Sequence, residues 1–522
     1  MKATDYDTNS SNLIYTAQYR ESEVSDFVGN PLIEALPPIA TKADWMKRLE
    51  HLPPFDPSER DEPAHVRSYY ILRLQRFFQP LPMHLDLGTR IDQVLRQGYV
   101  GRNPDTAERG EVLQRLYEDV QQGTATNAVF CDTQPIASFS LVGASGVGKS
   151  TTTERILSTF PQVIYHPKLA LHQVVWLKLD CPHDGDIKNL GLDMLVELDR
   201  ALNTDFRKQY GARIDQEALL GHVKHLMATY SVGIIVIDEI QNLSVKRTDS
   251  RDEMMNYFQT LCNTFKLPIM LMGTIKAMKL LQPDLRQARR NAALGAFTWE
   301  RLRNDKAWEL MLGSLWEYQW LEEPIELTES MANMLYEETQ GIVAVLSNAF
   351  ILAQLRALRN KQKKLSEDLF KWVIKKDMAP IQPMIKALQS GDPRRIARYE
   401  DIELIDFDSL VEREQQAILL GGLKGSVKAK QPVTSDEAKA ITVLEVGGFN
   451  RDLAAAAVSR AMEKGIKGCK ALTRHAYEDL IQSDDKNSIE PDPDDLRNHA
   501  GEHAVSSIRE GNFTKGVPED VE

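Results

Sequence analysis

The sequence predicts an α/β fold in which helices cover both faces of a parallel sheet. Near-continuous apolar runs alternate with stretches of helical periodicity between about residues 138 and 303, as expected for strands that are buried on both faces. A glycine-rich turn follows the first of these runs and leads into a helical stretch. A later apolar run ends in two acidic residues, at the edge of such a sheet where ligands bind.

The bulk composition is that of a large globular protein. The 522 residues exceed one ordinary hydrophobic core, so we expect several domains. No apolar run approaches the ~20 residues that span a bilayer, and the N-terminus lacks a secretory pattern, so we expect a cytoplasmic protein with no membrane partner. Four scattered cysteines without a CxxC pair make a zinc site or disulfide framework unexpected. With a net charge of −12, DNA contact would need a local basic patch.

The first 75 residues are rich in proline, notably at 30–38 and 52–57. Because proline breaks regular elements, we expect an N-terminal extension that is an extended arm or a small docking region, with a solvated leader as the alternative. Helical patterns at 91–95 and 111–120 then open an α/β core over residues 76–303. Its predicted strands are 138–143, 174–179, 232–239, 267–274 and 296–299, and its predicted helices are 149–160, 187–202, 216–229 and 253–265.

The turn after the first strand matches the Walker A pattern at every fixed position. Its glycines let backbone N–H groups point at phosphates, and the next helix presents its positive end to the same anion. Lys149 can reach the β- and γ-phosphates, and the Ser150 hydroxyl can bind Mg²⁺. We therefore expect ATP and Mg²⁺ as cofactors. The predicted nucleotide contacts are Gly143, Ala144, Ser145, Gly146, Val147, Gly148, Lys149, Ser150 and Thr151.

The acidic pair predicts hydrolysis rather than binding alone. Asp238 is placed to hold Mg²⁺ through water, and Glu239 to polarise the attacking water. Thr274 ends the next strand, where additional-strand ATPases carry a polar residue that helps to hold the same water. The alternative for Thr274 is a hydroxyl that satisfies its own turn.

Two basic segments each allow two interpretations. Residues 284–290 contain three arginines, of which Arg289 or Arg290 is favoured over Arg286 as a finger that reaches a neighbouring subunit's γ-phosphate. In that case oligomerisation completes the active site, whereas the alternative is a solvated face. Lys246, Arg247 and Arg251 follow the acidic strand and either face DNA in a central pore or belong to an ordinary solvated loop.

Only helical periodicity remains from 304 to 400, at 308–318, 330–340, 344–358 and 365–375. We expect a helical lid here, although the stretch after Gly341 lacks the arginine that often contacts the γ-phosphate from a lid. A weaker helical region follows at 401–483. Residues 484–522 hold 11 acidic and 4 basic residues and are expected to form a disordered tail.

In order, the Walker A turn, the acidic strand end, the polar strand end, the arginines and the helical lid resemble an AAA+ ATPase. Flanking segments narrow the resemblance to the TnsC family, the ATP-dependent target-selection regulators of Tn-seven-like transposons. The segments that carry it are 30–38, 98–104, Tyr165 with His166, 236–241, 270–276, 284–290 and 395–400.

This resemblance implies a homo-oligomer, as a ring or filament, that assembles with ATP on double-stranded DNA. It would link a target selector of the TnsD/TniQ type to a TnsB-type transposase and a TnsA-type endonuclease, with hydrolysis resetting the assembly. It also places selector docking in residues 1–75 and docking of the transposase machinery in the C-terminal region. Two alternatives stay open: a signalling or scaffold ATPase that does not use DNA, and a replication-initiator-type ATPase, which would normally append a winged helix.

Overall fold

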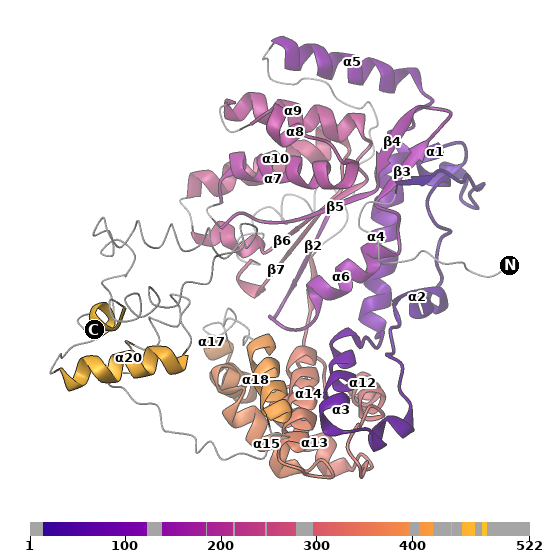
Figure 1. Ribbon diagram of the computed structural model, residues 1–522. Helices are drawn as coiled ribbons and strands as arrows, with labels where there is room; N and C mark the ends of the chain where they lie inside the picture. Colours follow the sequence, from indigo (N-terminus) through magenta and orange to yellow (C-terminus); the bar gives the residue numbers. More distant parts are fainter. Residues whose placement is uncertain are drawn as a thin grey trace. The chain divides into compact units, whose positions relative to one another are not determined.

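The structure is a computed structural model (Figure 1) that divides into two compact units, residues 1–423 and 424–522. The first unit contains the sheet and the lid. The residues that the structure describes are 14–122, 138–183, 185–211, 214–245, 248–277, 296–396, 407–420, 440, 451–464 and 472–477.

A parallel five-stranded sheet forms the centre of the first unit, and it confirms the predicted α/β class. Its order is β5-β6-β7-β2-β8. The strands are β2 (Phe139–Gly143), β5 (Trp176–Asp180), β6 (Ile234–Asp238), β7 (Ile269–Gly273) and β8 (Ala296–Trp299). All four neighbouring pairs run parallel, and β7 separates the Walker A strand β2 from the acidic strand β6.

Helices cover both faces of this sheet (Figure 1). One face packs on α7 (Ile187–Leu202), α9 (Gln216–Thr229) and α10 (Thr248–Phe265), and the other on α4 (Pro82–Val100) and α6 (Lys149–Ser158). The alternation of strand side chains explains why β6 is apolar from Ile234 to Ile237. Its residues Ile235 and Ile237 enter the first core, whereas Ile234 and Val236 enter the second. Outside these layers, α5 (Ala107–Gln122) packs on α9, and α8 (Phe206–Gln209) follows α7.

The strand predicted at 174–179 is in fact two strands in two sheets. Strand β4 (Leu171–Val174) pairs antiparallel with β3 (Val163–His166), and β1 (Ile14–Thr16) pairs parallel with β3. Strand β5 then joins the main sheet. An apolar run cannot mark where a chain passes from one sheet to another when its residues are buried in both.

The expectation of an extended N-terminal arm is wrong for residues 14–75. They form α1 (Pro31–Glu34), α2 (Lys42–Leu49) and α3 (Ala64–Ile71). Pro31 occupies the first position of α1, where the missing N–H costs no intrahelical bond, so the proline starts a helix instead of preventing one. Leu32 and Trp45 are buried in the core beneath the sheet, and α3 packs on the lid helix α14.

Three of the segments that carry the family resemblance meet inside this unit. The Asn30 side chain donates to the Tyr99 carbonyl at 2.8 Å, which joins segments 30–38 and 98–104. Gln173 bonds the buried His166 ring and also donates to the carbonyl of Leu32. These segments therefore build the packing of α1, α4 and the small sheet.

The lid is a helical bundle around the fully apolar middle of α14 (Val343–Arg359). Its other helices are α12 (Lys306–Trp316), α13 (Glu329–Thr339), α15 (Glu367–Lys376), α16 (Gln382–Ser390) and α17 (Pro393–Ile396). Within the part of the chain that the structure describes, no single helix is both long and apolar enough to cross a membrane. Helices α13 and α14 pass that test only as a pair bent by 119°.

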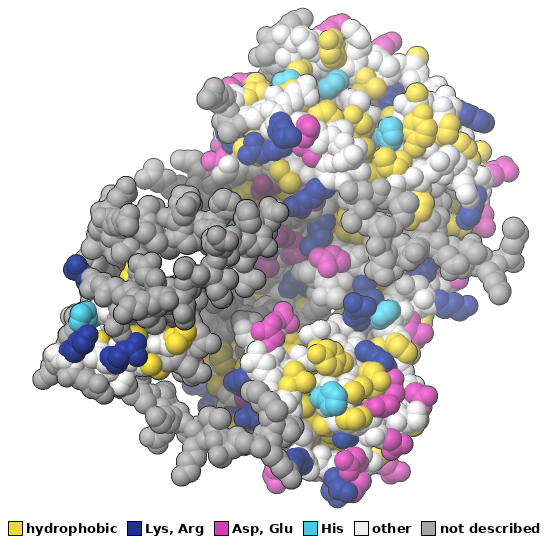
Figure 2. All heavy atoms as spheres, in the orientation of Figure 1, with side chains coloured by type: hydrophobic (Ala, Val, Ile, Leu, Met, Phe, Trp, Pro, Cys, Tyr) yellow, Lys and Arg dark blue, Asp and Glu magenta, His cyan; other side chains and the backbone are white. Residues whose placement is uncertain are grey.

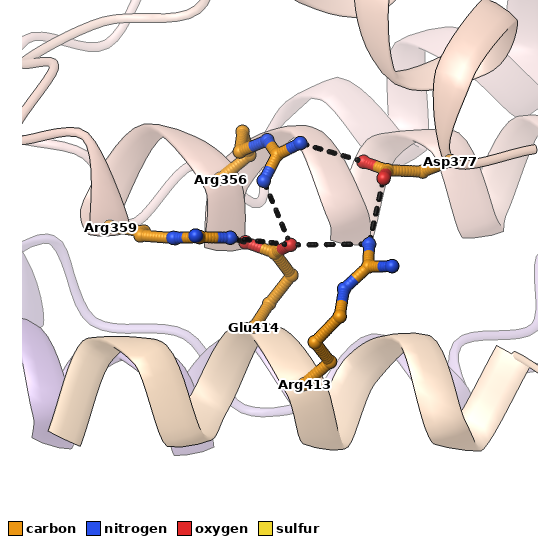
Figure 3. A network of polar contacts seen from close by, with 5 residues as sticks. All are labelled: Arg356, Arg359, Asp377, Arg413 and Glu414. Carbon is orange, nitrogen blue, oxygen red and sulfur yellow. Dashed lines mark hydrogen bonds and ion pairs between the residues drawn. The ribbon is translucent and has the colours of Figure 1, made fainter. Parts of the chain in front are cut away.

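Packing of the lid continues past the boundary expected at residue 400, through α18 (Phe407–Leu420) (Figure 3). Glu414 on α18 is fully buried and accepts hydrogen bonds from Arg356 and Arg359 of α14 at 3.0 and 3.2 Å. Arg413 donates to Asp377 at 2.7 Å. In the second unit, α20 (Arg451–Glu463) packs through Ala454, Ala457 and Val458. The predicted tail at 484–522 lies outside the described residues.

Candidate nucleotide-binding site

The turn between β2 and α6 has the backbone of a phosphate-binding loop. Gly146 and Gly148 have φ values of 78° and 91°, which favour glycine, and Gly148 directly precedes α6. A Cβ on Gly143 would lie 2.4 Å from the carbonyl oxygen of Trp299 on β8, so this position has no room for a side chain. The local backbone geometry therefore explains why glycine occupies the fixed positions of the pattern.

Lys149 lies folded back against this loop. Its ammonium donates to the carbonyl oxygens of Gly143 and Ala144, both at 2.9 Å, and the side chain is buried. Burial lowers the pKa of Lys149, while the carboxylates of Asp238 and Glu239 act in the opposite direction. Charged phosphate oxygens are stronger acceptors for an ammonium than neutral carbonyls, so this lysine is suited to exchange one for the other.

The two residues predicted to hold a metal are brought together although 88 positions separate them. The Ser150 hydroxyl on α6 donates to Oδ2 of Asp238, at the end of β6, over 2.6 Å. Asp238 is only 4% exposed. A hydroxyl and a carboxylate are the hard oxygen donors that Mg²⁺ takes when phosphates supply other ligands, so the residues fit this ion.

Glu239 follows at the same edge with an unusual backbone. Its φ of 55° is left-handed, and its N–H donates to Oδ1 of Asp238 at 2.8 Å. Left-handed backbone is costly for a residue with a Cβ and tends to persist where function requires it. The pKa of Glu239 is raised, because its surroundings displace water and because the charge of Asp238 lies beside it.

Thr274 comes to this edge from β7 and is joined to Glu239 through a residue that sequence reasoning missed. Gln241 is the second residue of the 3₁₀ helix Ile240–Val245, which follows the acidic pair. Its Oε1 accepts from the Thr274 backbone N–H at 3.0 Å, and its Nε2 donates to the Glu239 carboxylate. A polar residue two places after the glutamate is the signal that could have identified it.

The lid touches the phosphate loop directly. The N–H of Ala344, in the first turn of α14, donates to the carbonyl oxygen of Gly146 at 3.2 Å. Arg301, which carried no prediction, secures the preceding turn by donating to the carbonyl and the side-chain oxygen of Gln340 at 3.0 and 2.6 Å.

Several predicted residues fall outside the described part of the chain. These are Arg286, Arg289 and Arg290, and also Lys246 and Arg247. Arg251 lies in α10, but its side chain is outside the described set. The arginine finger and the DNA contacts therefore stay predictions. No cluster of three or more His, Cys, Asp or Glu side chains that could hold a metal occurs among the described residues.

Residues 137–281 match the family model described as an AAA domain. This stretch has the AAA+ fold. Similar solved structures include the ORC2 protein of Aeropyrum pernix in ADPNP–ADP complexes, with 11% identity, a TM-score of 0.32 and coverage of 78% of this chain and 94% of that one. The Walker-type ATPase of Pyrococcus abyssi has 15% identity, a TM-score of 0.31 and coverage of 61% and 91%.

The ORC1 protein of Aeropyrum pernix in complex with DNA is also similar, with 12% identity, a TM-score of 0.34 and coverage of 62% and 85%. Likenesses this distant carry no argument about function. Comparison with curated proteins gives no significant match.

Proposed function

We propose that this chain hydrolyses ATP. The observation that carries the proposal is the strand order β6-β7-β2, because parallel strands bring their carboxyl ends to one edge of the sheet. At that edge lie a lysine suited to bind phosphate, two side chains with oxygen atoms suited to bind a metal ion, a further carboxylate, and a polar residue that follows β7. These residues are Lys149, Ser150, Asp238, Glu239 and Thr274.

In the proposed reaction the loop N–H groups and the Lys149 ammonium hold the β- and γ-phosphates. Mg²⁺, bound through Ser150 and Asp238, would neutralise charge on the phosphate oxygens. The Glu239 carboxylate accepts a hydrogen bond from a water and orients its oxygen toward the γ-phosphorus. As the new P–O bond forms, the bond to the β–γ bridging oxygen breaks and ADP leaves with that electron pair. Glu239 takes the water proton, and inorganic phosphate is the second product.

We further infer that the ATP-bound protein assembles as a homo-oligomer on duplex DNA and links a TnsD/TniQ-type selector to TnsB-type and TnsA-type partners. The flanking segments of the sequence support this part. On the face drawn in Figure 2, the Lys and Arg side chains of described residues are interspersed with Asp and Glu. Because the chain has a net charge of −12, DNA contact needs a local basic set, for which we propose Lys246, Arg247 and Arg251. Selector docking is proposed for residues 1–75 and transposase docking for 401–483.

The test measures ATP turnover by the full chain with and without duplex DNA, across a series of salt concentrations. Negative-stain imaging with an ATP analogue accompanies it. Turnover that rises with DNA, and DNA binding that weakens steeply with salt, support the whole proposal. Turnover that ignores DNA, with no DNA-bound oligomers, favours the scaffold ATPase instead. A chain that binds ATP and never turns it over refutes the enzymatic part.

A further inference from the structure

The side chain of Gln241 spans the gap between two strands at the candidate site. One end, Oε1, accepts from the backbone N–H of Thr274, at the point where β7 ends. The other end, Nε2, donates to the carboxylate of Glu239, just past β6. The amide is therefore held at both ends, and its oxygen and nitrogen cannot exchange places without losing both bonds.

Gly273, the last residue of β7, leaves room for this bridge because it has no side chain. A Cβ on Gly273 would lie 2.7 Å from Oε1 of Gln241 and 2.8 Å from Cγ2 of Ile240. Asn242, the next residue along, uses its amide elsewhere and donates to the carbonyl of Cys181 at 2.9 Å. The side-chain amides of these two neighbouring residues therefore bind different partners. Of the two, the amide of Gln241 is the one that contacts the Glu239 carboxylate.

We propose that Gln241 is a positioning residue that aims the Glu239 carboxylate and couples it mechanically to the end of β7. Glu239 has a left-handed backbone and lies one residue beyond the end of β6, so no strand fixes the direction of its carboxylate, and the Gln241 side-chain N–H supplies that constraint. Because the same amide is anchored on the Thr274 backbone, a displacement of the β7 end would be transmitted to Glu239. This role rests on the proposed ATP hydrolysis.

A double-mutant cycle tests the role. Gln241→Ala removes the bridge, and Gln241→Glu keeps the length and the acceptor for Thr274 but loses the donor to Glu239. Each is made in the wild-type chain and in a Glu239→Ala background, with Asn242→Ala as the matched amide control. Single-turnover hydrolysis and the Kd for ATP are measured for all of them.

Both Gln241 variants should lower single-turnover hydrolysis by about tenfold or more in the wild-type chain, which is a part of the roughly 10²- to 10⁴-fold that a positioned general base supplies. ATP affinity should stay within about twofold. In the Glu239→Ala background, Gln241→Ala should cause no further loss, because its effect passes through the missing carboxylate.

Equal losses in both backgrounds, or a loss matched by Asn242→Ala, would show a merely structural role and overturn the inference. Wild-type rates in both Gln241 variants would also overturn it while leaving the proposed function intact. A wild-type chain without hydrolysis removes the proposed function, and this role with it.

Discussion

Ala344 in the lid donates its backbone N–H to the carbonyl oxygen of Gly146 in the phosphate loop, over 3.2 Å. The lid is thus in contact with the loop through the main chain. The stretch after Gly341 has no arginine that could reach a phosphate, which made a charged lid sensor unexpected. A main-chain contact needs no such side chain, because any residue with an N–H can make it.

The first prediction concerns the turn that delivers Ala344. Gly341 has φ +70°, and a Cβ there would lie 2.0 Å from the carbonyl oxygen of Leu302. Gly341→Ala should displace the lid turn from the loop and weaken ATP binding by severalfold. Gly391→Ala is the matched control, since Gly391 has φ +63° and nothing within 4 Å of the added Cβ.

Both substitutions carry the cost of a left-handed alanine, about 1–2 kcal/mol, and only Gly341→Ala adds the clash. Thermal unfolding and calorimetric ATP binding measure the two effects. Equal ATP affinity in the two variants would contradict the coupling of the lid to the loop.

The second prediction is that Glu239→Gln binds ATP and does not turn it over. The amide keeps the size of the side chain but cannot accept the water proton, so hydrolysis should fall by roughly 10²- to 10⁴-fold. Glu154→Gln is the control: this exposed carboxylate on α6 pairs with Lys178 at 2.8 Å and has no part in the reaction. Single-turnover hydrolysis at the wild-type rate in Glu239→Gln would refute the assignment, and DNA-bound oligomers should persist in it.

The third prediction is that Lys149→Ala loses ATP affinity. The substitution removes the only side-chain cation that the loop itself supplies, since the loop runs from Gly143 to Ser150 and contains no other lysine or arginine. Because the loop backbone remains, the chain should stay folded while its Kd for ATP rises by about tenfold or more. A filter-binding or calorimetric assay measures this, with circular dichroism as the check on folding. Unchanged binding would exclude Lys149 from the phosphate site.

The sequence predicts the candidate site where chemistry constrains residue type and spacing together. Gly143, Lys149, Ser150 and Asp238 could be placed because a loop, a helix and a strand each need a particular residue at a fixed offset. The sequence marks Gln241 only as a polar residue two places after Glu239, because its role depends on where β7 lies in the sheet, and strand order is a tertiary property. The same holds for Arg301, whose acceptor on Gln340 lies 39 residues away.

The fold was predictable as a class and less so at its edges. Strands that are buried on both faces appear in the sequence as clear apolar runs. The hydrophobic pattern does not show that residues 171–180 are divided between two sheets. The N-terminal prolines predict an extended arm or a small docking region, whereas Pro31 starts a helix whose next residue is fully buried. Local propensity could not show that α4 offers α1 an apolar surface to pack on.

The fourth prediction is a loss of stability on acidification that passes through His84. Nδ1 of this buried ring accepts from the N–H of Leu81 at 3.0 Å, and the ring packs on Phe78 and Trp299. Burial lowers the pKa of His84 to about 4. The unfolded chain binds a proton near pH 6.5 and the folded chain does not, so stability is complete above pH 6.5 and falls as the pH drops toward 4.

The expected contribution is about 2 kcal/mol between pH 7 and 5, measured by urea unfolding at each pH. His84→Asn retains an acceptor for Leu81 but does not titrate, so its stability should depend less on pH over this interval. Parallel pH profiles for the two proteins would show that His84 is not the group responsible.

The fifth prediction concerns the charge network that holds α18 on the lid. Glu414 is fully buried and faces Arg356, Arg359 and Arg413, whose side chains are 12%, 39% and 51% exposed. Glu414→Gln removes one of the two carboxylates that compensate Arg356, the other being Asp377 at 3.5 Å, and breaking a buried pair costs about 3–5 kcal/mol. Water already reaches two of the three arginines, so we expect the loss of stability to lie near the lower end of this range.

Glu412→Gln, two residues away on the exposed face of the same helix, should change stability by less than about 0.5 kcal/mol. Urea unfolding monitored by tryptophan fluorescence suits the measurement, because the ring centre of Trp372 on α15 lies 3.8 Å from Cζ of Arg356. Since Glu414 is shielded from ions, its effect should persist in high salt, unlike that of an exposed pair. Equal effects of the two substitutions would mean that apolar packing alone holds α18 in place.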